Sequence, residues 1–332
     1  MGFFDFMQES IAIDLGTANT LIIHNDKVVV DEPSIVAKNV RTGEVIAIGK
    51  RAQQMHGKAH KDIETMRPLK DGVIADFQSS EQMIRGFIKM IPRKRSLFSP
   101  ALKMVVCIPS GVTEVEKRAV VDSAEHAGAK DVWLIMEPMA AAIGIGIDVL
   151  EPKGNMVIDI GGGTTEIAVI SLGGIVCDKS IRVAGDEFTD NIQTYMKTRH
   201  NIAVGDIMAE QIKINVGSAL TELDDPPPNY AVHGRDLMSG IPKEIIVTYK
   251  EIAGALNNSI EQIEDNKKLG RVIERFCIKN KIVGTFFSTP QGVNTTLSGT
   301  KNSLEAVSYT HLRAHETPEH LVCRLLLEKK NQ

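Results

Sequence analysis

The chain has 332 residues, of which 43% are hydrophobic, 24% charged and 5% aromatic, and its formal net charge is −4. These values predict a globular protein of about two domains and give no electrostatic reason to expect a nucleic-acid partner. No stretch approaches the ~20 apolar residues of a membrane-spanning helix and no secretory leader is visible, so we expect a cytoplasmic protein.

The first half of the chain alternates predicted strands and helices. Short apolar runs separated by turn signals predict strands at residues 11–14, 21–24, 27–30, 34–38 and 45–48. Further along, helical spacing and a capping box at Thr113 and Glu116 predict helices at 80–90, 113–126 and 139–145, with strands at 103–108 and 131–136 between them.

The second half begins with the same pattern. Residues 155–183 repeat a strand, a glycine-rich turn and two more strands, and helices are expected at 185–199, 206–214 and 249–263, with a strand at 241–247. This order predicts an α/β chain with an internal duplication.

Each half contains one glycine-rich turn that follows an aspartate. The turns run from Asp14 to Thr20 and from Asp159 to Glu166. Glycine lets backbone N–H groups approach a phosphate closely, and each aspartate could hold Mg²⁺ through water. One copy alone could be an ordinary β-turn, but the second copy favours a phosphate site. The candidate phosphate-binding residues are Gly16, Thr17, Ala18, Asn19, Gly161, Gly162, Gly163 and Thr164.

Two further segments give these turns a family context. The sequence RPLKDGVIAD begins at Arg67, and EPMAAAIG begins at Glu137. Together with the two turns, over residues 9–264, they resemble the superfamily of actins, heat-shock chaperones and sugar kinases, and within it the MreB group of bacterial actins.

The resemblance implies an actin-like α/β fold. Two similar ribonuclease-H-like lobes would flank a nucleotide cleft, each with a smaller inserted subdomain. The first lobe would span residues 1–150 with its insertion at about 31–75, and the second would span 151–264 with its insertion at about 184–248.

The resemblance also assigns roles. Glu137 would orient or activate the attacking water, and Thr164 would help to place it near the γ-phosphate. Glu210 and Lys213 would lie near the ribose and adenine. The alternatives are that Glu137 is only a helix-start residue, and that Glu210 and Lys213 form only a surface ion pair.

A basic loop at residues 93–95 is followed by Leu97 and Phe98. In the MreB group the corresponding loop inserts into the membrane, which would make these two side chains a membrane contact. The alternative is a solvated loop with one buried aromatic. Residues 1–7 could either add to membrane binding or pack on the domain.

The function implied is an ATP- and Mg²⁺-dependent filament protein that organises cell-wall synthesis and rod shape. Its partners would be further copies of itself, the inner face of the cell membrane, and the membrane proteins of the rod complex. A sugar-type small-molecule kinase is the alternative from another class, but no aspartate is as well placed for substrate activation as Glu137 is for water.

The chain departs from the family after residue 264. The family's third glycine-rich turn is not recognisable, and the nearest candidate is the segment at 297–300. We expect 265–332 to be aberrant, with 307–332 resembling a translated sequencing-adaptor tail. The second lobe would then be incomplete, which leaves a truncated, non-catalytic remnant as a further alternative.

Overall fold

The computed structural model describes residues 8–92, 101–152, 154–264, 284–286, 294–297 and 307–309. Leu97 and Phe98, residues 1–7, and most of the segment after 264 therefore lie outside the described residues. Within the described ranges, none of the helices combines the length and the apolar character needed to cross a bilayer.

The first lobe, by which we mean the elements from β1 to α4, is built on a mixed sheet. Alternation along β1 buries Ile11, Ile13 and Leu15 on one face, with exposures of 2%, 1% and 6%. β1 pairs in parallel with β9, which pairs in parallel with β10, whereas β2 and β3 continue the other side as an antiparallel meander. The order is β10 (Ala129–Met136), β9 (Ala101–Ile108), β1 (Gln8–Leu15), β2 (Asn19–His24) and β3 (Lys27–Pro33).

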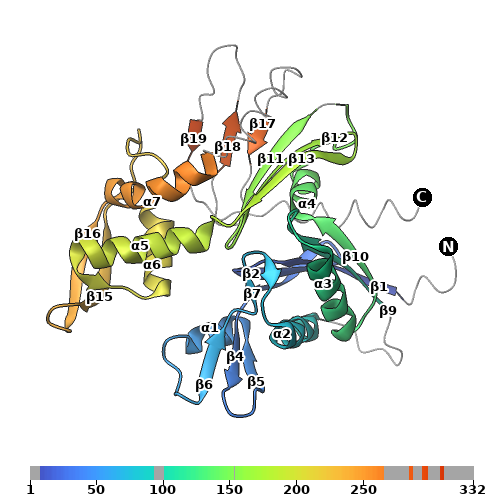
Figure 1. Ribbon diagram of the computed structural model, residues 1–332, viewed down its shortest axis with the longest axis horizontal. Coiled ribbons are helices and arrows are strands. Elements are labelled where there is room, and N and C mark those ends of the chain that lie inside the picture. Colours follow the sequence, from blue (N-terminus) through green and yellow to red (C-terminus); the bar gives the residue numbers. More distant parts are fainter. Residues whose placement is uncertain are drawn as a thin grey trace.

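Two helices cover this sheet (Figure 1). α2 (Phe77–Met90) buries Met83, Ile84, Phe87 and Ile88 in the core below the sheet. α3 (Glu114–His126) contacts β9, β10 and α2, and α4 (Glu137–Gly144) contacts strands of both lobes.

A small insertion follows β3. It contains the three-stranded sheet β5 (Val45–Ile48), β4 (Val36–Asn39) and β6 (Ile63–Met66), the helix α1 (Gly49–Met55), and the two-stranded pair β7 (Leu69–Lys70) and β8 (Val73–Ile74). The insertion has its own apolar cluster around Ile35, Ala37 and Ala52.

The second lobe, by which we mean the elements from β11 to α7, repeats the antiparallel meander. β11 (Asn155–Ile160), β12 (Thr165–Ser171) and β13 (Gly174–Ile181) form one sheet. β12 is buried on both faces, because Ile167 and Val169 pack in one cluster and Ala168 and Ile170 pack with α4 residues in another.

Three helices and a second sheet complete the described part of this lobe. α5 (Gly185–His200), α6 (Asp206–Val216) and α7 (Tyr249–Glu264) pack with the sheet of β14 (Ile202–Ala203), β15 (Tyr230–Asp236) and β16 (Pro242–Val247) around one apolar core. Three further strands, β17 (Gly284–Phe286), β18 (Asn294–Leu297) and β19 (Val307–Tyr309), form a sheet of their own. The described residues thus form an α/β fold in which the antiparallel meander occurs twice, as the sequence predicts.

The predicted elements are largely confirmed, with differences at their ends. α2 begins at Phe77 and not at residue 80, because the Asp76 side chain accepts a 2.7 Å hydrogen bond from the Ser79 N–H and acts as the N-cap. The Thr113–Glu116 capping box is confirmed. Helix α1 and strands β6 and β15 were not predicted from the sequence.

Candidate functional site

The two glycine-rich turns lie directly against each other. A Cβ built at Gly162 would lie 2.6 Å from the Ala18 Cβ, and one at Gly163 would lie 2.8 Å from the Thr17 Oγ1. Such distances are shorter than any real Cβ contact, so each position requires glycine for this approach. The structure thus brings the two candidate phosphate turns, one from each lobe, to a single place.

A third turn, at Asp71 and Gly72, joins the first two. The Gly72 N–H donates a 3.0 Å hydrogen bond to the Thr17 hydroxyl. The φ of Gly72 is 76°, and a Cβ there would lie 3.1 Å from the Thr164 Cγ2. This turn belongs to the RPLKDGVIAD segment, for which the sequence suggested family membership but no role.

Four carboxylates gather beside the turns. Asp14 on β1, Glu137 at the start of α4, Asp159 on β11 and Glu166 on β12 are close enough to interact. Burial raises the pKa of the Glu137 carboxyl well above its usual value, and the charges of Asp14, Asp159 and Glu166 raise it further. Glu137 is also the first residue of α4, so it occupies the helix-start position that the sequence predicts.

The acidic cluster suits a hydrated divalent cation. Among the described residues, no group of three or more acidic, histidine or cysteine side chains is placed to hold a metal directly. Mg²⁺ usually binds through one or two carboxylates and keeps several waters. Asp159 is 8% exposed, and Asp14 lies two residues before Gly16. Both carboxylates therefore lie beside the turns, where they could bind a hydrated cation without enclosing it.

Glu210 and Lys213 lie next to the second turn. Lys213 Nζ lies 2.7 Å from Glu210 Oε2 and donates a 2.9 Å hydrogen bond to the Gly185 carbonyl. The Thr189 hydroxyl donates to the same Glu210 oxygen at 3.0 Å. The Gly185 N–H in turn donates to the Gly161 carbonyl at 3.1 Å. The ion pair is therefore formed, partly buried, and attached to the start of α5.

Two further polar contacts join the lobes. Arg67 Nη1 lies 2.7 Å from Asp186 Oδ1, and His56 Nε2 lies 3.2 Å from Asp206 Oδ2. Burial acts to raise the pKa of Asp206, but hydrogen bonds from Gln193 and His56 outweigh it and leave the pKa below its usual value. Neither cross-lobe pair was predicted from the sequence.

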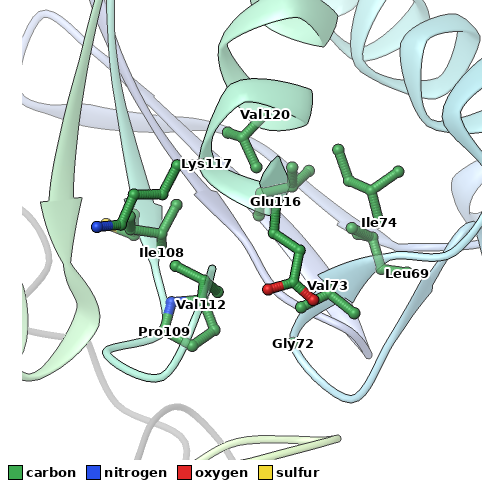
Figure 2. Close-up of a pocket in the computed structure, with 12 residues that line it drawn as sticks. Leu69, Gly72, Val73, Ile74, Ile108, Pro109, Val112, Glu116, Lys117 and Val120 are labelled. Atoms are coloured by element: carbon green, nitrogen blue, oxygen red, sulfur yellow. The ribbon is translucent and has the colours of Figure 1, made fainter. Parts of the chain in front are cut away.

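A small pocket lies beside the Gly72 turn (Figure 2). Its lining is mainly apolar, with Val73, Pro109 and Val112 around it and the Glu116 carboxylate directed toward Val73. Because it offers few polar groups to a phosphate or ribose, we do not assign the nucleotide to it.

Comparisons with known proteins give the chain similar relatives. The model of the MreB/Mbl protein family matches residues 8–277, which extends beyond the 9–264 recognised in the sequence. The cell shape-determining protein Mbl of Bacillus subtilis (strain 168) is 44% identical over 266 residues, which are 80% of this chain and 78% of that protein. The cell shape-determining protein MreB of Escherichia coli (strain K12) is 45% identical over 258 residues, or 76% and 74% of the two chains.

Solved structures show the same fold. Crystal structures of MreB 5 of Spiroplasma citri bound to AMPPNP and to ADP match with a TM-score of 0.75 and 36% identity, and cover 84% of both chains. A MamK double helical filament matches with a TM-score of 0.65 over 85% of this chain and 86% of that one, and at 17% identity it supports the fold alone.

Proposed function

The chain belongs to the MreB/Mbl family, and from this premise we propose that it is an ATP-dependent bacterial actin that forms filaments and organises cell-wall synthesis and rod shape. The observation that carries the proposal is the contact between two glycine-rich turns from different lobes, beside Glu137. The names of the Bacillus and Escherichia relatives support the cell-shape role.

ATP would bridge the two lobes. Its phosphates would lie along the turns at Gly16–Asn19 and Gly161–Thr164, where glycines permit close backbone approach. Its ribose and adenine would extend toward Glu210 and Lys213, which are tied to the second turn through Gly185. The AMPPNP and ADP bound to MreB 5 support an adenine nucleotide.

Mg²⁺ would bind beside the phosphates, held by Asp14 and Asp159 through water. When bound, the cation would neutralise charge on the phosphate oxygens. The four carboxylates already concentrated here give it an electrostatic reason to bind.

Glu137 and Thr164 would act on the attacking water. Burial and the neighbouring negative charges raise the pKa of the Glu137 carboxyl, which favours its acceptance of a proton from the attacking water. Thr164 is 7% exposed and its side chain contacts the Gly72 turn, so its hydroxyl is held in a fixed place. Phosphoryl transfer to water depends mainly on such positioning.

The contacts between copies in a filament would depend on the angle between the two lobes. Hydrolysis would change the contacts that ATP makes to both turns and so alter a hinge-type closure. We propose that the filaments lie on the inner face of the cell membrane, with Leu97 and Phe98 as the contact and the rod-complex membrane proteins as partners.

The test is phosphate release by the purified full-length chain with MgATP, together with pelleting of assembled protein by ultracentrifugation. We expect slow hydrolysis that needs no second substrate, and ATP-dependent sedimentation. ADP formation that depends on an added sugar would contradict the filament proposal and support the kinase alternative. No binding of MgATP at all would support the non-catalytic remnant.

A further inference from the structure

Glu166 is a buried carboxylate to which the proposed chemistry gives no contact with the nucleotide or with the attacking water. It is 1% exposed and lies on β12, two residues after Thr164. In the sheet register it stands between Asp159 on β11 and Ser180 on β13, so the three residues form one row across three strands. A buried carboxylate is costly unless hydrogen bonds satisfy it.

The hydrogen bonds to Glu166 come from both lobes. The Ser180 hydroxyl donates to its Oε1 at 2.5 Å from the neighbouring strand. The Ser110 N–H and hydroxyl both donate to its Oε2, at 3.0 and 2.5 Å. Ser110 lies in the loop after β9 of the first lobe, so two of the three donors cross between the lobes.

The loop that holds Ser110 is fitted closely to the second lobe. A Cβ built on Gly111 would lie 2.9 Å from the Ser180 Cβ, so the loop approaches β13 as closely as a glycine permits. On its other side, Pro109 Cγ lies 2.7 Å from where a Cβ of Gly72 would be. Gly72 itself contacts Thr17 and Thr164, as described above.

These contacts form one continuous path from Glu166 to the proposed site of the γ-phosphate. We propose that Glu166 is a positioning residue for ATP hydrolysis: by holding the Ser110 loop against the second lobe, it keeps the Gly72 turn in contact with Thr17 and Thr164. The inference rests on the proposed function and adds a residue to it.

The physical reason is the cost of an unsatisfied buried charge. If the lobes part at this point, Glu166 loses both donors of Ser110 and keeps only that of Ser180. Losing those charge-assisted bonds disfavours the parted arrangement. The carboxylate therefore favours the arrangement in which the Gly72 turn and both phosphate turns meet.

The experiment compares Glu166→Gln with the wild-type full-length chain. The amide keeps the size of the side chain but removes its charge, so neutral hydrogen bonds at most replace the charge-assisted ones that the carboxylate accepts from Ser110 and Ser180. We expect kcat for phosphate release to fall by ~10-fold or more, because positioning is lost, while the Kd for MgATP changes by less than ~3-fold.

Two serine variants separate positioning from general stability. Ser110→Ala is expected to lower kcat as Glu166→Gln does, and Ser110→Thr, which keeps the hydroxyl, is expected to restore it. Combining Ser110→Ala with Glu166→Gln should add little further loss, because both break the same contact. If Glu166→Gln fails to fold, the comparison of Ser110→Ala with Ser110→Thr tests the inference, again by the change in kcat at an unchanged Kd for MgATP.

Glu251→Gln is the matched control. Glu251 also accepts from a main-chain N–H and a hydroxyl, both of Thr248, at 2.9 and 2.8 Å, but within one lobe. Its kcat should equal that of the wild type. A wild-type kcat in Glu166→Gln, or a parallel fall of kcat, affinity and Tm, overturns the inference alone. A wild-type chain that binds MgATP without hydrolysing it overturns the proposed ATPase and the inference with it.

Discussion

The guanidinium of Arg67 and the carboxylate of Asp186 form a 2.7 Å ion pair that joins the first lobe to the first turn of α5. The Asp186 N–H also donates a 2.7 Å hydrogen bond to the Gly162 carbonyl. The ion pair therefore acts on the second phosphate turn through a single residue.

Breaking this pair should weaken nucleotide binding modestly. Both side chains are more than 40% exposed, at 46% and 41%, so the pair contributes at most about 1 kcal/mol. We expect Arg67→Gln to raise the Kd for MgATP by ~2–5-fold at low salt, with a smaller effect at high salt, as titration calorimetry can measure. An effect that is the same at both salt concentrations would argue against an electrostatic origin.

Gly162→Ala should separate the two phosphate turns. The added methyl would lie 2.6 Å from the Ala18 Cβ, so the turns must move apart for it to fit. We expect the Kd for MgATP to rise by at least ~10-fold and the protein to lose ~1–3 kcal/mol of stability.

Gly254→Ala is the control for this substitution. Gly254 lies within α7, and a Cβ there meets no atom within 4 Å. Alanine in a helix interior should stabilise the protein by ~0.5–1 kcal/mol and leave nucleotide binding unchanged. If Gly162→Ala and Gly254→Ala change the Kd for MgATP equally, the turns do not contact the nucleotide.

The local signals in the sequence predicted more of the fold than of the contacts between distant segments. The sequence predicts the phosphate turns, the Glu137 segment and the Thr113 capping box, because a few consecutive residues define each of them. It does not predict the contact between Glu166 and Ser110, because 56 residues separate the two and Ser110 belongs to no motif recognised in the sequence. Strand β15 was missed because its alternation is weak, with only Val232 buried. Short polar elements of this kind are fixed by their partners rather than by their own sequence.

Glu137→Gln should abolish hydrolysis and stabilise the nucleotide-free protein. The raised pKa of Glu137 means that the folded chain binds a proton more tightly than the unfolded chain does. The folded state therefore loses stability as the pH rises from the ordinary glutamate pKa through the raised one, and the amide escapes this loss. At neutral pH we expect the variant to be more stable than the wild type.

Thermal unfolding across pH measures this effect. The difference in Tm between Glu137→Gln and the wild type should be positive at neutral pH and shrink as the pH falls toward the ordinary glutamate pKa. Glu125→Gln, at an exposed position of α3, should show no such trend. A destabilised Glu137→Gln at neutral pH would contradict the electrostatic account of this site.

Leu97 and Phe98 lie outside the described residues, so their membrane role stays a prediction from the sequence. Replacing both with serine should abolish co-sedimentation with vesicles of anionic lipid, because the apolar area that would enter the interface is removed. Met238→Ser removes a side chain that is 87% exposed in the β15–β16 turn and should leave vesicle binding intact. Retained binding by the double variant would assign it to the basic residues at 93–95 or to residues 1–7.

The ion pair of Glu210 and Lys213 distinguishes a nucleotide contact from a surface contact. If Lys213 lies near the ribose and adenine, Lys213→Met should lower the affinity for ATP by ~10-fold. The affinity for tripolyphosphate should stay unchanged, because tripolyphosphate lacks the nucleoside. Lys117→Met is the matched control, since Lys117 forms the same i, i+3 pair with Glu114 at 2.7 Å on α3. Lys213→Met also removes the hydrogen bond to the Gly185 carbonyl, so a disturbed phosphate turn would weaken both ligands together. If Lys213→Met weakens the binding of ATP but not that of tripolyphosphate, the ion pair contacts the nucleoside. If the affinity for ATP is unchanged, Glu210 and Lys213 form only an ordinary ion pair.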